Sequence, residues 1–125
     1  AEVKLNQTKL SYYEQNANFP EYEKAALSYY KNSEAFEPNE LLKAAWIFSE
    51  HITTPSSLKK ASEWAEKSVM RGETSENTYI LAKLYFLTGN KEQAKTYAEM
   101  SKNMASQAQK DSTLADALLK QINEK

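Results

Sequence analysis

The sequence predicts an all-α protein built from antiparallel helix pairs, and three observations point to this class. An eight-residue segment recurs at a fixed offset, because residues 61–68 (ASEWAEKS) resemble residues 94–101 (AKTYAEMS) and 94 − 61 = 33. A period of about 33–34 residues with small residues at helical spacing is typical of stacked helix pairs. The chain holds only 2 Gly and 3 Pro, too few for the turns of a many-stranded sheet. Its most frequent residues mostly suit exposed helix positions.

Four helices are expected in the amino-terminal half. The first covers residues 5–15, whose periodic apolar positions are largely aromatic. Phe19-Pro20 marks the start of a second helix, through Tyr22–Tyr30, and a third begins at Pro38, because proline is favoured in the first turn of a helix. Thr54 is expected to cap the fourth helix, which extends from Pro55 to about residue 68.

Three further helices are expected in the carboxyl-terminal half. Gly72 ends the fourth helix, and Ser75 is expected to cap the fifth. Gly89 is a natural left-handed C-cap and Asn90 begins the sixth helix, so a two-residue turn should join two antiparallel helices. Asp111 is expected to cap a final helix that closes the stack. The prediction is about seven helices, as three pairs and a capping helix.

The residue pattern resembles the tetratricopeptide repeat (TPR) family. That signature combines large and small residues on a first helix, glycine at the turn, and small or bulky residues on a second helix. One copy of the chain matches it at Leu81, Ala82, Tyr85, Gly89, Ala94, Ala98 and Ser101. The resemblance implies one domain, residues 1–125, in which a right-handed superhelix stacks antiparallel pairs. Its approximate units are 3–36, 38–71 and 75–107, with a capping helix at 111–124.

The other two units match the signature less closely. The middle unit matches at Ala44, Ala45, Phe48, Ala61, Ala65 and Ser68. From Phe48 to Ala61 is 13 residues, against 9 from Tyr85 to Ala94, so four extra residues are expected in the turn within 50–57. In the first unit Tyr13 stands where the family has a small residue.

A narrower likeness concerns the helical region attached to some exported bacterial thioredoxin-like proteins. Residues 44–48, 61–69 and 78–85 are similar to it, within a span of about 40–105. The redox motif of those proteins has no match, because the chain has no cysteine. The likeness implies a non-catalytic, periplasmic module, with a cytoplasmic location as the alternative.

Small and aromatic residues have distinct expected roles in the stack. Ala61, Ala65, Ala94 and Ala98 should lie where paired helices approach to about 8–10 Å. Trp64 and Tyr97 are expected to fill the space between adjacent pairs. Tyr12, Tyr13, Tyr22, Tyr29 and Tyr30 form an aromatic group, expected to be core of the first pair and alternatively a binding face.

Neither composition nor motifs predict catalysis or a cofactor. With 16 basic and 17 acidic residues the net charge is −1, so nucleic acid and anionic membranes are not favoured partners. No apolar run approaches the roughly 20 residues of a membrane span. His51, the only histidine, is expected at the surface or in a loop, without a metal. Four scattered glutamates are expected on solvated helix faces: Glu21, Glu23, Glu63 and Glu66.

The family geometry points to a concave surface lined by the first helix of each pair. On this sequence it implies the following binding residues: Trp46, Ser49, Glu50, Tyr79, Lys83 and Phe86. The carboxylate clamp of chaperone-binding members is not matched, since Leu42, Trp46 and Tyr79 occupy positions of its polar residues. The expected function is therefore a non-catalytic protein-protein interaction module that prefers apolar or aromatic peptide surface. The alternative is an accessory carboxyl-terminal domain that dimerises or orients a thioredoxin-like oxidoreductase. Whether the chain itself forms a homodimer is left open by the sequence.

Overall fold

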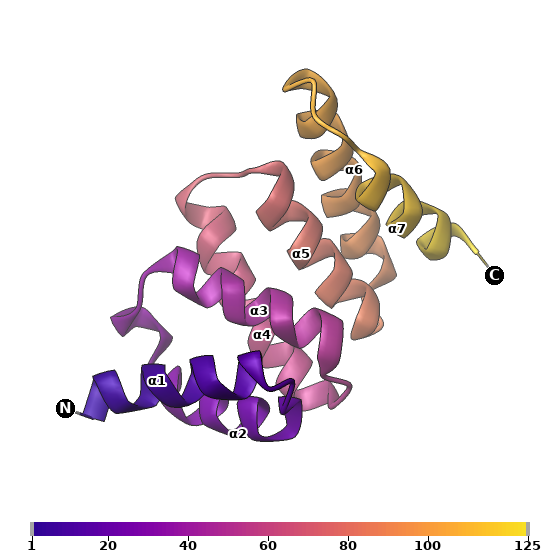
Figure 1. The fold of residues 1–125 in the computed structure, drawn as a ribbon. Coiled ribbons are helices and arrows are strands. Elements are labelled where there is room, and N and C mark those ends of the chain that lie inside the picture. Colours follow the sequence, from indigo (N-terminus) through magenta and orange to yellow (C-terminus); the bar gives the residue numbers. More distant parts are fainter. Residues whose placement is uncertain (1, 125) are drawn as a thin grey trace.

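The computed structural model describes residues 2–124, and within them the side chains of residues 8–32 and 34–124. This part of the chain forms seven α-helices and one short 3-10 helix, η1 (Figure 1). Their bounds are α1 Glu2–Gln15, α2 Phe19–Tyr29, η1 Ser33–Ala35, α3 Pro38–His51, α4 Pro55–Arg71, α5 Ser75–Leu87, α6 Lys91–Gln107 and α7 Thr113–Asn123. The predictions of an all-α fold and of about seven helices are confirmed.

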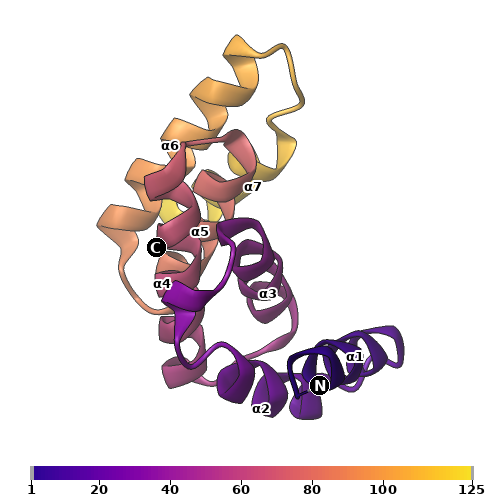
Figure 2. The same cartoon turned by 90° about the vertical axis from the view of Figure 1, so that its left-hand side faces the viewer.

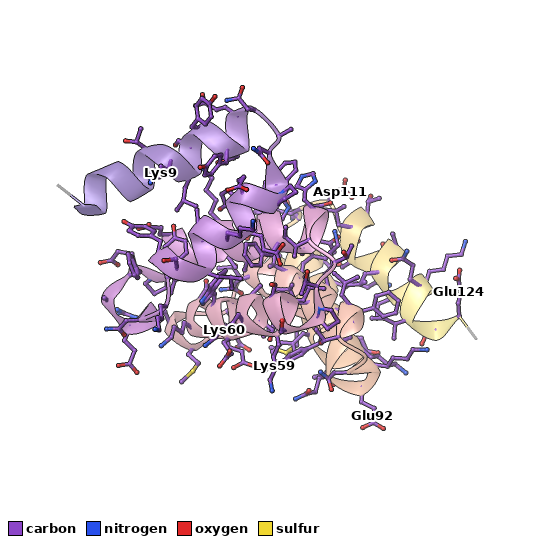
Figure 3. The ribbon with its side chains drawn as sticks, turned by 90° about the horizontal axis from the view of Figure 1, so that it is seen from below. Lys9, Lys59, Lys60, Glu92, Asp111 and Glu124 are labelled. Atoms are coloured by element: carbon purple, nitrogen blue, oxygen red, sulfur yellow. The ribbon has the colours of Figure 1, made fainter. Side chains whose placement is uncertain are left out.

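The α-helices pack as sequential antiparallel pairs. Helix α1 contacts α2, α3 contacts α4, and α5 contacts α6, while α7 packs on α6 and α5. Helices α1 and α3 lie on one side of the molecule and α2 and α4 on the other, so each pair contributes one helix to each layer (Figure 2). Lys59 and Glu92 extend outward from the layer of second helices (Figure 3). None of the helices in residues 2–124 is both long enough and apolar enough to cross a membrane.

Prolines mark the beginning of three helices, as predicted. Pro38 and Pro55 are the first residues of α3 and α4, and Pro20 is the second residue of α2. Proline suits these positions because its φ is already helical and because the amide hydrogen it lacks would have no partner within the helix. These helix starts can be predicted from the sequence, because the restricted φ of proline does not depend on its surroundings.

The start of α5 differs from the prediction, because Thr74 and not Ser75 is the N-cap. The Thr74 hydroxyl accepts a hydrogen bond from the Asn77 amide at 3.0 Å, and the Asn77 side chain accepts one from the Thr74 amide at 2.8 Å. This reciprocal pair is a capping box with asparagine in the place of the usual Glu or Gln. Asn77 is also buried and donates to the Gly72 carbonyl at 2.8 Å, which joins α5 to the end of α4.

The turn between α5 and α6 contains the predicted left-handed glycine. Gly89 has φ of +87°, and the amide of Asn90 donates to the Tyr85 carbonyl oxygen at 2.8 Å. These features form a Schellman-type C-cap, which requires a residue that tolerates positive φ. The connection covers Thr88–Asn90, so it has three residues and not the two expected.

The cap of the last helix also departs from the prediction. Ser112, not Asp111, occupies the N-cap position of α7. The Asp111 carboxylate nevertheless accepts a hydrogen bond from the Thr113 amide at 2.8 Å. Asp111 therefore accepts a hydrogen bond from an amide of the first turn, although it lies one residue before the N-cap and not at the N-cap.

The prediction of a longer turn between Phe48 and Ala61 is wrong. The connection of α3 to α4 is Ile52–Thr54, three residues like that of α5 to α6. The four extra residues lengthen the helices, because α4 begins six residues before Ala61, whereas α6 begins three residues before Ala94. The physical reason is that Thr54 and Pro55 supply a helix start one turn earlier.

The small residues of the repeat lie at the helix contacts, as predicted. All four repeated alanines, Ala61, Ala65, Ala94 and Ala98, are completely buried. The Trp64 ring lies 5.5 Å from that of Tyr30 and 5.1 Å from that of Phe48, so it fills the joint between the first two pairs. Tyr97 departs from its expected role, because its ring contacts Tyr85 of its own pair at 5.7 Å.

Candidate functional site

The layer of first helices contains a hollow between α3, α5 and α7. Helix α5 contacts both α3 and α7, and the three helices lie in sequence across the molecule (Figure 1). The hollow has a volume of about 210 Å³. Its largest apolar side chains are Trp46 from α3, Tyr79 from α5 and Leu114 from α7. Trp46 and Tyr79 lie on α3 and α5, the first helices of two consecutive pairs.

Two of these apolar groups are unusually open to solvent. Trp46 is 44% exposed and Leu114 is 65% exposed. Leu114 lies on α7 beside Ala115, which is buried, so the packing of α7 on its neighbours directs Leu114 outward. A tryptophan and a leucine exposed around one hollow form the kind of apolar surface that is typical of contact sites.

The floor of the hollow is fixed by the capping of α5. The Ser101 hydroxyl of α6 donates to the Ser75 carbonyl oxygen at 2.7 Å, and the Thr74–Asn77 capping box holds the same turn. Because the first turn of α5 is bonded to α6, Tyr79 and Ile80 line the hollow from a rigid element. The site therefore combines an ordered floor with an exposed apolar rim.

Two carboxylates lie at the edge of this hollow. A hydrogen bond from its own backbone amide and the nearby Lys110 ammonium hold the pKa of Glu76 below its usual value. The Lys110 ammonium lies 3.5 Å from the Glu76 carboxylate. Hydrogen bonds from the hydroxyl and the amide of Thr113 lower the pKa of Asp111. Both side chains are thus anionic at neutral pH.

Glu50 and Lys83, two of the expected binding residues, form an ion pair beside the hollow. The Lys83 ammonium lies 3.2 Å from the Glu50 carboxylate, which connects α5 to α3. Burial raises the pKa of the Tyr79 hydroxyl, and the charge of Glu50 raises it further. The two charges neutralise each other across the joint between helix pairs, so neither is an isolated charge for a ligand.

Ser49 and Phe86 do not line the hollow. Ser49 is buried, and its hydroxyl donates to the Trp46 carbonyl oxygen at 2.7 Å. Phe86 is half-buried against the core. Of the six residues expected from family geometry, the structure therefore brings Trp46 and Tyr79 together at the hollow.

The contribution of α7 to the hollow was not predicted from the sequence. Residues 111–124 were expected to cap the stack, yet Leu114 and Ala115 form one wall of the hollow. Helix α7 packs on α6 and α5, as α5 packs on α4 and α3.

The remaining sequence candidates have structural roles. Tyr22 and Tyr30 are buried, as expected of core residues, whereas Tyr12 is exposed. His51 is at the surface, as expected, and its ring stacks on Phe19 at 3.7 Å. Glu66 departs from the expectation of a solvated face, because it is half-buried and accepts a hydrogen bond from Tyr85. Glu23 similarly accepts one from Ser57.

Neither the described side chains nor the comparisons with known proteins indicate a metal site or a family for this chain. Among the side chains that the structure describes, those of residues 8–32 and 34–124, no group of three or more His, Asp or Glu is placed to hold a metal ion. Comparison of the chain with protein-family models, with curated proteins and with solved structures finds no match.

Proposed function

We propose that the protein is a non-catalytic interaction module of TPR type that binds an apolar segment of another polypeptide. The observation that supports this most is the exposed apolar rim of Trp46 and Leu114 around an ordered hollow. Buried tryptophans at protein interfaces often account for about 2 kcal/mol or more of binding free energy. A helix of the partner, or an extended peptide, inserts an aliphatic or aromatic side chain between the two residues.

The TPR-type superhelix is part of this proposal. Its support is the 33-residue period of the second helices, from Ala61 to Ala94, and the sequential antiparallel pairs. The hollow also has a polarity, because Asp111 lies on its α7 side, while the charge of Glu76 is already paired with Lys110. A partner segment with a basic residue next to its apolar anchor fits this charge distribution.

The alternative, an accessory domain of a periplasmic thioredoxin-like oxidoreductase, stays a prediction. Its basis is the likeness at residues 44–48, 61–69 and 78–85. Those segments include buried packing residues such as Trp64 and Leu81, which any stack of helix pairs needs. The periplasmic location and the homodimer are predictions of the same kind.

Selection of binding peptides from a random display library tests the proposed function. The full chain is the bait, and Kd of the selected peptides is then measured for the protein and its Trp46→Ala and Leu114→Ser variants. We expect Trp46→Ala to weaken binding by about 2 kcal/mol, roughly thirtyfold in Kd. Leu114→Ser should weaken it by about tenfold, because less apolar area is lost.

Met70→Ser is the matched control for this experiment. Met70 is 86% exposed on α4, on a different part of the surface, so its replacement also removes an exposed apolar side chain. We expect Kd to be unchanged for Met70→Ser. Peptides that bind all three variants as tightly as the unaltered protein would contradict the proposed site.

A further inference from the structure

Helix α4 carries an apolar side chain that packing within the chain does not explain. Met70 is 86% exposed, the largest exposed fraction among the large apolar side chains that the structure describes. It borders an open recess of about 360 Å³, together with Phe36 and Pro38. The 33-residue repeat places Asn103 of α6 at the equivalent position (103 − 70 = 33), where it is also exposed. The scaffold therefore accepts a polar residue at this position.

Two basic side chains flank Met70 on the same helix. Lys67 lies one turn before Met70 and Arg71 follows it directly, and all three border the recess. Neither Lys67 nor Arg71 forms an ion pair with a side chain that the structure describes. Glu34 of η1 also borders the recess, so two cations and one carboxylate leave a net charge of +1. We call Lys67, Met70 and Arg71 the Met70 surface.

The hollow between α3, α5 and α7 has the complementary chemistry. Its rim is formed by the apolar side chains of Trp46 and Leu114, and Asp111 lies on its α7 side. The amide and the hydroxyl of Thr113 both donate to Oδ1 of Asp111. Among the described residues Oδ2 of Asp111 has no hydrogen-bond or ion-pair partner, so this oxygen can accept from a cation.

We propose, on the basis of the proposed function, that this hollow binds the Met70 surface of a second copy of the chain. Met70 of one copy inserts between Trp46 and Leu114 of the next. Methionine suits such a gap because its unbranched thioether side chain adapts to irregular apolar surfaces. Arg71 beside it donates a charge-assisted hydrogen bond to Oδ2 of Asp111.

This contact joins two different surfaces of the chain, because the recess and the hollow share no lining residue. Two bound copies therefore still present one free hollow and one free Met70 surface. Such a head-to-tail contact builds a ring or a filament, and not a closed twofold dimer. Because the contact is small, we expect weak association that increases with protein concentration.

Sedimentation velocity of the full chain over a series of concentrations tests this proposal. We expect the sedimentation coefficient to rise with concentration, and Met70→Ser or Trp46→Ala to raise Kd for self-association at least about tenfold. Leu87→Ser is the matched control, because Leu87 is 43% exposed and lines neither the recess nor the hollow. It should leave Kd unchanged. A protein that stays monomeric up to its solubility limit, or a Met70→Ser variant that associates like the unaltered protein, would overturn the proposal.

A mixture of the Met70→Ser and Trp46→Ala variants distinguishes this contact from a twofold one. The first variant keeps an intact hollow and the second keeps an intact Met70 surface, so together they should form a 1:1 complex that cannot grow further. A mixture that stays monomeric contradicts the proposal. Association that persists in Met70→Ser and is lost in Trp46→Ala would overturn it too, because two hollows would then pack on each other.

Asp111→Asn tests the electrostatic part of the contact. Asparagine keeps an oxygen that can accept from Thr113 and removes the charge, so we expect Kd for self-association to rise about threefold and to depend less on salt. Glu99→Gln, an exposed position of α6 away from both surfaces, is the matched control and should have no effect. An unaltered Kd and salt dependence in Asp111→Asn would overturn the pairing of the hollow with the Met70 surface.

Competition with a peptide selected for the hollow separates this proposal from the proposed function. We expect the peptide to dissociate the assembled copies. Peptide binding to a chain that does not self-associate would overturn the second copy as partner and leave the proposed function intact, whereas failure of both would contradict both. At protein concentrations far below Kd for self-association the hollow is free, so Met70→Ser remains a valid control for peptide binding.

Discussion

At the scale of single residues, Asn77 illustrates how one side chain joins two helices. Its amide oxygen accepts from the Thr74 amide, and its amide nitrogen donates to Ser68 at 3.2 Å and to Gly72 at 2.8 Å. The side chain therefore caps α5 and satisfies polar groups at the end of α4. Because Asn77 is buried, removal of its side chain leaves these groups without a partner and without water.

Asn77→Ala is expected to lower the free energy of unfolding by about 2 kcal/mol, through the lost cap and the unsatisfied groups. Urea unfolding followed by circular dichroism measures this change. Asn103→Ala is the control, because Asn103 is exposed on α6. We expect its replacement to change stability by less than about 0.5 kcal/mol. An equal effect of the two substitutions would show that Asn77 has no special role.

Because of its buried tyrosines, the protein is expected to have a free energy of unfolding that depends on pH in the alkaline range. Burial raises the pKa of Tyr30 above its usual value of 10.0, and the hydrogen bond to Glu40 raises it further. The folded protein therefore retains a proton that the unfolded chain loses above about pH 10. Stability from this group is fully present below pH 10 and falls as the pH rises towards the pKa of the folded state.

We expect the urea midpoint to fall above about pH 10 and to fall less steeply in Tyr30→Phe. Tyr12→Phe is the control, because Tyr12 is exposed, and it should keep the full pH dependence. Urea unfolding at a series of pH values measures both. Identical pH profiles for the unaltered protein and Tyr30→Phe would contradict the raised pKa of Tyr30.

At the scale of helices, the sequence predicted starts better than caps and connections. Pro38 and Pro55 mark helix starts because proline restricts φ wherever it stands. Thr74 was missed because Asn77, three residues later, is not the Glu or Gln of the common capping box. The extra residues before Ala61 were assigned to a turn, because a residue count does not reveal whether an insertion extends a helix or a loop. Such choices depend on tertiary packing.

Ala98→Leu tests the contact between α5 and α6. Ala98 is completely buried, so a larger side chain must separate helices that are already in contact. We expect the free energy of unfolding to fall by about 1–3 kcal/mol. Ala117→Leu, at an exposed position of α7, is the control and should have little effect. An unchanged thermal midpoint in Ala98→Leu would contradict the close packing of this pair.

At the scale of the whole molecule, repetition accounts for the scaffold and only partly for the candidate site. The family geometry implied Trp46 and Tyr79 on neighbouring first helices, and the structure brings both to one hollow. Leu114 was not predicted as a residue of the site, because the sequence pattern indicated only a capping role for α7. Ser49 was expected at the surface, but its burial depends on how α3 packs, which a family pattern does not specify. We propose that Trp46 lies at the centre of a polypeptide-binding surface.

The fluorescence of Trp46 tests this claim most directly. The protein has two tryptophans, and Trp64 is buried whereas Trp46 is exposed. The Trp46→Phe variant therefore shows the emission of Trp64 alone, and the emission of Trp46 is the difference between the unaltered protein and this variant. The measurement is a titration with a peptide selected for binding, with emission wavelength and acrylamide quenching recorded together. We predict that the emission of Trp46 shifts to the blue and that its quenching falls as the peptide saturates. Saturable peptide binding that leaves both properties of Trp46 unchanged would contradict the claim.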